Sequence, residues 1–181
     1  CSAGILLDNE CLERYEIAPQ RHAELILPMV DSLLRESGLK LGDMDALAFA
    51  RGPGAFTGIR IATGVIQGLA FGAGLPVIPV SSLAALAQSA AGEHRHILAA
   101  IDARMQEIYY AGYSINEQGL AEPLSEETVC KPEALTITGE EPVFGVGSGW
   151  RTYAGILTRK SGRNYNGHDG ERYPRAAHIL T

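Results

Sequence analysis

The sequence has little of what marks a secreted, membrane-bound or metal-binding protein. Its 3 cysteines form no CxxC pair and no metal-ligand spacing, and an odd number without a framework fits a reducing compartment. No run of about 18 uninterrupted apolar residues occurs, so no membrane-spanning helix is expected. No signal peptide is visible at the N-terminus. These absences predict a cytoplasmic protein with no membrane partner.

Positive charge is also scarce. The chain has 15 Lys and Arg against 21 Asp and Glu, which gives a net charge of −6. Because Lys and Arg supply most of the affinity for a phosphate backbone, we do not expect the chain to hold nucleic acid alone. An acidic subunit can still serve RNA chemistry through a partner. The apolar fraction of 46% and charged fraction of 20% are typical of a globular domain.

The first residues read as the middle of a sheet. Cys1 is followed at once by an apolar run, so we expect that a preceding segment is missing. Two strands, Ala3–Leu7 and Cys11–Ile17, are predicted to form a hairpin around the turn Asp8-Asn9. In that register Cys1 lies opposite Glu16, which argues against a Cys1–Cys11 disulfide.

Hydrophobic periodicity then predicts an alternation of strands and helices. A hairpin followed by this alternation is typical of a mixed sheet covered by helices, here a ribonuclease-H-like domain without its first strand. A second paired-strand start at Ile97 divides the chain into predicted domains 1–96 and 97–181. The polar stretch 158–175 is predicted to be a mobile loop. Helices are expected at 22–37, 57–71, 81–91 and 150–157, and further strands at 45–50, 76–80, 97–101, 108–113 and 142–146.

The loop from Arg51 to Arg60 follows a strand and opens a helix. Glycines allow a tight turn, and helix N-termini attract anions. However, no Walker Gly-Lys-Ser/Thr is present, and the third glycine comes one residue late for a dinucleotide loop. A tight strand-to-helix turn is therefore favoured over autonomous nucleotide binding, and Thr57 is expected to cap the helix. The loop residues given a candidate functional role are Gly52, Pro53, Gly54, Thr57, Gly58 and Arg60.

A stripe of glycines follows on the same helix. Gly64, Gly68 and Gly72 recur every four residues and so share one face. Each glycine costs roughly 1 kcal/mol of helix stability relative to alanine. Such a stripe indicates that something packs very close, either the protein's own sheet or a helix of another subunit.

Five runs of the sequence carry a resemblance to a known family: Arg21–Pro28, Asp45–Phe49, Arg51–Arg60, Pro76–Leu83 and Ile101–Tyr109. They resemble the TsaB family, also called YeaZ. The resemblance is continuous over about residues 3–113 and patchier beyond. It implies an α/β fold of the actin, Hsp70 and sugar-kinase type (ASKHA), with two ribonuclease-H-like lobes and mixed sheets.

The resemblance also implies a function. Family members act as a non-catalytic scaffold beside TsaD, the catalytic paralogue, and the ATPase TsaE. The complex forms N6-threonylcarbamoyladenosine at position 37 of tRNAs that read ANN codons. A heterodimer with TsaD is expected, and a homodimer when the chain is alone. Both dimers are expected to use a four-helix interface made by the helices at 22–37 and 57–71. The interface residues assigned are Met29, Leu33, Ile61, Gly64, Val65, Gly68 and Gly72.

The metal-binding positions of the paralogue are altered here. TsaD has His-x-x-x-His after the equivalent of Pro79-Val80, and such a pair lies on one helix face and can bind a metal. The matching positions here are Ser82 and Leu86. We therefore expect no metal, no catalysis and no cofactor bound by this chain alone, with ATP used by the complex.

Two alternatives from other functional classes remain beside this hypothesis. One is a small-molecule kinase or ATPase of the same fold type, and another is an autonomous RNA-binding module. The absence of a phosphate-binding lysine counts against the first and the net charge of −6 against the second. The role of Asp102 is also open: the favoured interpretation is a hairpin turn with an exposed Asp102–Arg104 or Arg104–Glu107 ion pair, and the other is a carboxylate that faces a cleft between lobes.

Overall fold

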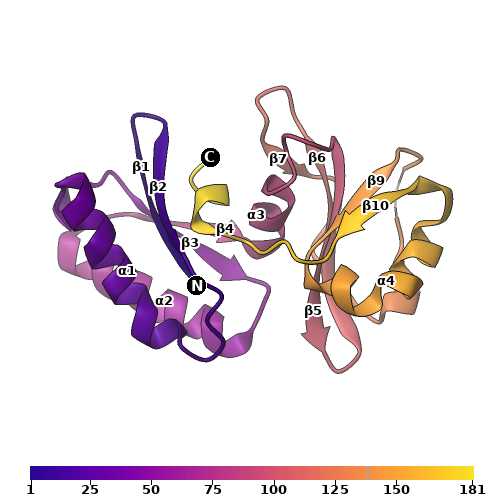
Figure 1. The fold of residues 1–181 in the computed structure, drawn as a ribbon, viewed down its shortest axis with the longest axis horizontal. Helices are drawn as coiled ribbons and strands as arrows, with labels where there is room; N and C mark the ends of the chain where they lie inside the picture. The colour runs from indigo at the N-terminus through magenta and orange to yellow at the C-terminus, as the bar shows by residue number, and fades with distance from the viewer. Residues whose placement is uncertain (138) are drawn as a thin grey trace. The chain divides into compact units, whose positions relative to one another are not determined.

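The computed structural model describes residues 1–137 and 139–181. Contacts divide the chain into two compact units (Figure 1). The first contains Cys1–Val80 together with Arg175–Thr181, and the second contains Ser81–Pro174. None of the helices in the described residues is both long and apolar enough to cross a membrane.

Unit 1 begins with the predicted hairpin. Strands β1 (Ser2–Leu7) and β2 (Glu10–Tyr15) pair antiparallel, with Leu7 opposite Glu10. The turn residues Asp8 and Asn9 have φ of 48° and 68°, as a two-residue hairpin turn requires. The Glu16 N–H donates to the Cys1 carbonyl at 2.9 Å, which confirms the predicted register. All three cysteines are free thiols.

Two helices and a second small sheet complete unit 1. Helix α1 (His22–Ser37) packs on β1 and ends where Gly38 takes a φ of 71°. A 3-10 turn, η1 (Leu41–Asp43), leads to β3 (Leu47–Gly52), which pairs with β4 (Val77–Ser81). Helix α2 (Phe56–Ala73) joins these strands and packs on β3.

The beginning of α2 differs from the prediction. The residue that caps it is Ala55, and no side chain accepts a hydrogen bond from its first turn. The prediction that Thr57 caps the helix is wrong, because the helix starts at Phe56 and Thr57 already lies inside the first turn.

The C-terminal residues return to unit 1. The 3-10 turn η4 (Ala176–His178) packs on β1 and β2. The Ala176 N–H donates to Ser2 Oγ at 2.9 Å, and Arg175 pairs with the mostly buried Glu13.

Unit 2 is built on a mixed sheet with the strand order β10-β9-β5-β6-β7, in which β8 also pairs with β6. The pairs of β6 with β5, β7 and β8 are antiparallel, whereas β9 is parallel to both β5 and β10. This confirms the mixed sheet. The strands are β5 (His96–Arg104), β6 (Glu107–Ile115), β7 (Ala121–Pro123), β8 (Thr128–Cys130), β9 (Val143–Val146) and β10 (Tyr165–Asp169).

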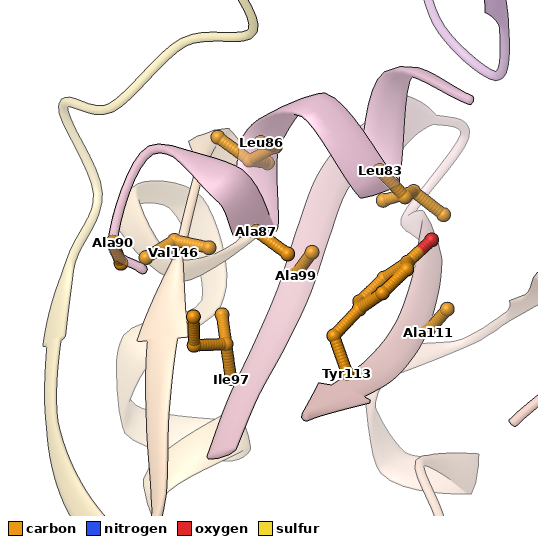
Figure 2. Packing of buried hydrophobic residues seen from close by; sticks show 9 residues of the cluster. All are labelled: Leu83, Leu86, Ala87, Ala90, Ile97, Ala99, Ala111, Tyr113 and Val146. Carbon is orange, nitrogen blue, oxygen red and sulfur yellow. The ribbon is translucent and has the colours of Figure 1, made fainter. Parts of the chain in front are cut away.

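Two helices cover the two faces of this sheet. Alternate β5 residues belong to different cores, as expected of a strand. Helix α3 (Ser82–Gln88) contributes Leu83 and Leu86 to one core, shown in Figure 2. Helix α4 (Ser148–Ser161) contributes Trp150 and Leu157 to the other. Two 3-10 turns, η2 (Pro132–Ala134) and η3 (Gly162–Asn164), complete the unit.

The predicted loop over 158–175 is wrong. This stretch contains the end of α4, η3 and strand β10, which pairs with β9 through Tyr165 opposite Val143. Ring contacts hold the strand: Trp150 stacks on His168 with centroids 5.3 Å apart. Tyr165 also hydrogen-bonds His168 at 2.7 Å. Tertiary packing therefore orders a segment whose composition is polar.

The bounds of the two units differ from the predicted domain bounds. The division falls between Val80 and Ser81, before α3, rather than between residues 96 and 97. Helix α3 packs on β5 and β6 and therefore belongs to the second unit. The last residues, Arg175–Thr181, belong to the first unit.

Candidate partner interface

One face of α2 is open along its whole length. Its residues are exposed and recur every three or four positions, so they lie in one stripe. Phe71 is 93% exposed and Phe56 is 68% exposed. We call this stripe the α2 outer face; it comprises Phe56, Arg60, Gly64, Gln67, Gly68, Phe71 and Gly72.

The three predicted glycines lie in this face. A Cβ atom built on Gly64, Gly68 or Gly72 would meet nothing within 4 Å. The stripe therefore does not pack against the protein's own sheet, and its packing against a helix of another subunit stays a prediction. A stripe without side chains lets such a helix come close, because interaxial distance depends on the side chains at the contact.

Leu33 corrects the predicted interface. It is 1% exposed and packs with Ala3 and Ile5 in the core of unit 1, so it is not available to a partner. Met29 lies one turn earlier on the same side of α1 and packs partly against the same core. Periodicity identified an apolar stripe of α1, but this stripe faces the hairpin.

The two other apolar residues that were predicted to contact a partner lie on the flank of α2. Ile61 and Val65 are half-buried, beside rather than within the α2 outer face. The prediction missed Phe71 and Phe56, which belong to that face, and Leu27 of α1, which is 50% exposed. A signal for Phe71 was present, because it stands three residues after Gly68 and thus extends the glycine stripe.

The loop before α2 folds as the favoured tight turn. Gly52 has a φ of 107°, and a Cβ there would lie 2.9 Å from Ile59 Cδ1, so this position requires glycine. The Gly52–Pro53 peptide is cis, and Gly54 lies next to it. At the other end, the Arg60 guanidinium lies 3.7 Å from the centroid of the Phe56 ring. Thr57 is exposed and Gly58 borders open space.

Both positions that the sequence analysis compared with the paralogue's histidines are buried. Ser82 is 6% exposed and Leu86 is 0% exposed. A Cβ built on Gly147 would lie 2.4 Å from Leu86 Cδ2, so the leucine fills this space tightly. Among the described residues, no group of three or more His, Cys, Asp or Glu side chains could hold a metal ion.

Neither the thiols nor Asp102 form a recognisable reactive centre. Burial raises the pKa of Cys11 and of Cys130, which disfavours the nucleophilic thiolate. Asp102 lies in β5 just before the hairpin turn that joins β5 to β6, and its Oδ1 accepts from the Arg104 N–H at 2.8 Å. The Arg104 contact is therefore a backbone hydrogen bond in place of the expected ion pair.

Comparison with known proteins defines first the class and then the family. The α/β architecture with a mixed sheet covered on both faces fits the match of residues 11–143 to the family model described as "TsaD: tRNA N6-adenosine threonylcarbamoyltransferase". The solved structure of YeaZ from Pseudomonas aeruginosa superimposes with a TM-score of 0.90 at 41% identity, covering 99% of this chain and 83% of that one. The protein therefore has the actin-like, ASKHA fold.

Curated relatives narrow the class to one family. The tRNA threonylcarbamoyladenosine biosynthesis protein TsaB of Haemophilus influenzae is 44% identical over 165 residues, which is 85% of this chain and 70% of that protein. TsaB of Escherichia coli K12 is 43% identical over 160 residues, covering 84% of this chain and 68% of the relative. The chain belongs to the TsaB (YeaZ) family, as its sequence motifs predicted.

Proposed function

We propose that this chain is the accessory subunit of the complex that forms N6-threonylcarbamoyladenosine at position 37 of tRNAs reading ANN codons. Its α2 outer face is the surface that docks TsaD and, without TsaD, a second copy of the chain. The observation that carries the proposal is an uncovered glycine stripe beside a phenylalanine that is 93% exposed, in a member of the TsaB family.

The chemistry of the α2 outer face suits a helix of a partner. Full burial of a phenylalanine side chain favours association by about 1.5–3 kcal/mol. Phe71 follows Gly68 by three residues, so a partner helix seated on the stripe can cover the ring as well. Leu27 of α1 adds a second exposed apolar side chain to unit 1. Part of this gain offsets the loss of translational and rotational freedom on binding.

The catalytic and nucleotide chemistry belongs to the other subunits. Leu86, which is 0% exposed, has no ligand atom for a metal, and the buried Ser82 cannot replace a histidine pair. The chain alone binds no metal or cofactor, and ATP is used by TsaE within the complex. With a net charge of −6, the chain reaches tRNA through its partners. This work takes place in the cytoplasm.

A pull-down by TsaD tests the docking surface. Gly68→Arg places a charged side chain at the centre of the stripe, and nothing within 4 Å clashes with it at Cβ. The variant should fold normally and bind TsaD about 100-fold more weakly, which is about 2.7 kcal/mol. Gly92→Arg is the matched control, because Gly92 is also exposed and open but lies in unit 2.

The outcome is read after circular dichroism and thermal melting have shown that both variants fold. Loss of TsaD binding by Gly68→Arg alone supports the proposal. A folded Gly68→Arg chain that binds TsaD like the wild type contradicts this docking surface. Wild-type chain that binds no TsaD at all contradicts the partnership itself.

A further inference from the structure

One asparagine of the chain stands directly before a glycine. Of the four asparagines, only Asn166 is followed by glycine, Gly167. The others, Asn9, Asn116 and Asn164, precede glutamate or tyrosine. The backbone nitrogen that follows an asparagine can attack the side-chain amide carbon, and a glycine hinders this approach least because it has no Cβ. The sequence therefore gives Asn166 the most reactive neighbour.

The two residues form a bulge at the edge of the unit 2 sheet. From Tyr165 to His168 the register advances by three residues in β10 but by only two in β9, so Asn166 and Gly167 together oppose one residue. Strand β10 is the last strand of the sheet and pairs with β9 (Figure 1). Because a bulge interrupts the ladder of hydrogen bonds, the pair lies outside the regular strand pairing.

The bulge requires glycine at position 167. Gly167 has a φ of 93°, in the region that side chains disfavour. A Cβ there would also lie 3.2 Å from Cε2 of Phe144, whose ring stacks on His94 with centroids 3.7 Å apart. A side chain that would shield Asn166 from attack cannot be accommodated. The fold itself thus keeps this asparagine next to a glycine.

The side-chain amide of Asn166 is available for the reaction. Asn166 is exposed, and its amide makes no hydrogen bond to any of the described residues. In contrast, Asn116 Oδ1 accepts from two backbone N–H groups at 2.9 Å, and Asn164 Nδ2 donates to the Gly139 carbonyl at 3.0 Å. Those amides must break hydrogen bonds before they can turn toward the backbone, whereas the Asn166 amide breaks none.

We propose that Asn166 is a site of spontaneous covalent modification, namely deamidation through a succinimide. The Gly167 nitrogen bonds to Asn166 Cγ while the bond from Cγ to the side-chain nitrogen breaks. That nitrogen leaves as ammonia and takes up the proton of the Gly167 N–H. Water then opens the ring at one carbonyl to give aspartate, or at the other to give isoaspartate, in which the main chain runs through the side chain.

The products change both the charge and the backbone of β10. Asn166 lines a cavity of about 270 Å³ together with Glu93 and Glu141, and the new carboxylate is ionised beside them at neutral pH. Isoaspartate also adds one carbon to the main chain between Tyr165 and His168, whose side chains share a hydrogen bond of 2.7 Å. The modification therefore weakens the attachment of β10, and this inference does not depend on the proposed function.

Ageing of the folded full chain in water labelled with heavy oxygen tests the proposal. Wild type is kept at physiological temperature and mildly alkaline pH, and conversion at each asparagine is measured by mass spectrometry of its peptides. Asn166→Gln is the matched control, because it keeps an exposed amide but needs a larger ring for the same attack. Asn166→Asp carries the charge of the product on a normal backbone.

We expect Asn166 to convert about 10-fold faster than Asn116 and Asn164. Its product should contain oxygen from the labelled water and should include isoaspartate. Aged wild type should melt roughly 2–4 °C lower than fresh protein, whereas ageing should leave the melting temperature of Asn166→Gln unchanged. Fresh Asn166→Asp should melt between fresh and aged wild type, because it lacks the lengthened backbone.

Three outcomes overturn the inference. One is conversion of Asn166 no faster than that of Asn116, and another is a product that contains aspartate without isoaspartate. The third is conversion in chain unfolded by urea but not in folded chain, since the fold would then prevent the attack. None of these outcomes concerns the α2 outer face, which TsaD binding tests separately.

Discussion

Helices α2 and α3 each follow a strand, yet they use their apolar residues in opposite ways. Of the 7 residues of α3, Ser82, Leu83, Ala85, Leu86 and Ala87 are buried, whereas Ala70 is the only buried residue among the 18 of α2. Ser81 caps α3 through two hydrogen bonds, to the N–H groups of Leu83 and Ala84, but α2 has no side-chain cap. The comparison indicates that α3 stabilises this chain through its burial, whereas α2 leaves its outer face exposed, as the proposed docking surface requires.

Helix α3 also contains Ser82 and Leu86, the two positions that the sequence analysis compared with the paralogue's histidines. Of these two positions, Leu86 belongs to the packed core of Figure 2. A core leucine gains stability from burial but offers no ligand atom. Leu86 therefore packs a core of unit 2, and the absence of a metal at this position stays a prediction.

The largest effect is expected at Leu86. Leu86→Ala removes a fully buried side chain and should lower the free energy of unfolding by about 2–5 kcal/mol. Urea denaturation followed by circular dichroism measures it. Phe71→Ala is the matched substitution on α2 and should change stability by less than about 0.5 kcal/mol. Equal losses at both positions would contradict the contrast between the helices.

Glycine substitutions should show the same contrast with opposite signs. A Cβ on Gly145 would lie 2.1 Å from Trp150 Cε2, so Gly145→Ala should cost about 1–3 kcal/mol through overpacking. Gly68→Ala meets nothing within 4 Å and should gain about 0.5–1 kcal/mol from helix propensity. Thermal melting of the two variants checks both signs. A destabilised Gly68→Ala would show that α2 packs on its own chain there.

The cap of α3 should have a smaller effect. Ser81→Ala leaves the N–H groups of Leu83 and Ala84 without their partner and should cost about 0.5–2 kcal/mol. Ser81→Asp keeps an acceptor and should recover part of the loss. Denaturant unfolding distinguishes the variants. Equal stability of Ser81→Ala and wild type would mean that the cap does not hold this helix.

The smallest effect is expected in the pH dependence of the free energy of unfolding at acid pH. Hydrogen bonds and charge from Arg172, which also bonds the Ser89 carbonyl at the end of α3, lower the pKa of Glu93. A lowered folded-state pKa means that the contribution is present above the usual pKa, near 4.5, and is lost as the pH falls through the folded value. Glu93→Gln should therefore flatten the pH dependence of unfolding below about pH 4.5. Identical curves for Glu93→Gln and wild type would refute the linkage.

The elements of the fold that could be predicted from the sequence are those marked by local signals. Asp8-Asn9 identified the hairpin, and the two serines at 81 and 82 marked the start of α3 without deciding which of them caps it, because turn and cap residues act within a few positions. Strand β10 was missed because its residues, Tyr165–Asp169, show no apolar alternation. Its order comes from Trp150 and the neighbouring strand, which are distant in sequence.

The candidate site was likewise predictable only as far as local signals reach. The glycine stripe was visible in the sequence, but periodicity alone could not tell which stripe of a helix faces the sheet. Leu33 was therefore assigned to a partner although it lies in the core, and Phe71 was missed although it is the most exposed large apolar residue described. The side of a helix that stays uncovered is a tertiary property.

Sedimentation velocity of wild type and Phe71→Asp tests the central claim, that α2 keeps its outer face for a partner, most directly. Phe71 is 93% exposed, so the variant should melt at the wild-type temperature. We expect the wild type to sediment as a dimer at micromolar concentration and the variant as a monomer, because a carboxylate at this position would be desolvated in the interface. A folded variant that dimerises as strongly as the wild type would contradict the claim.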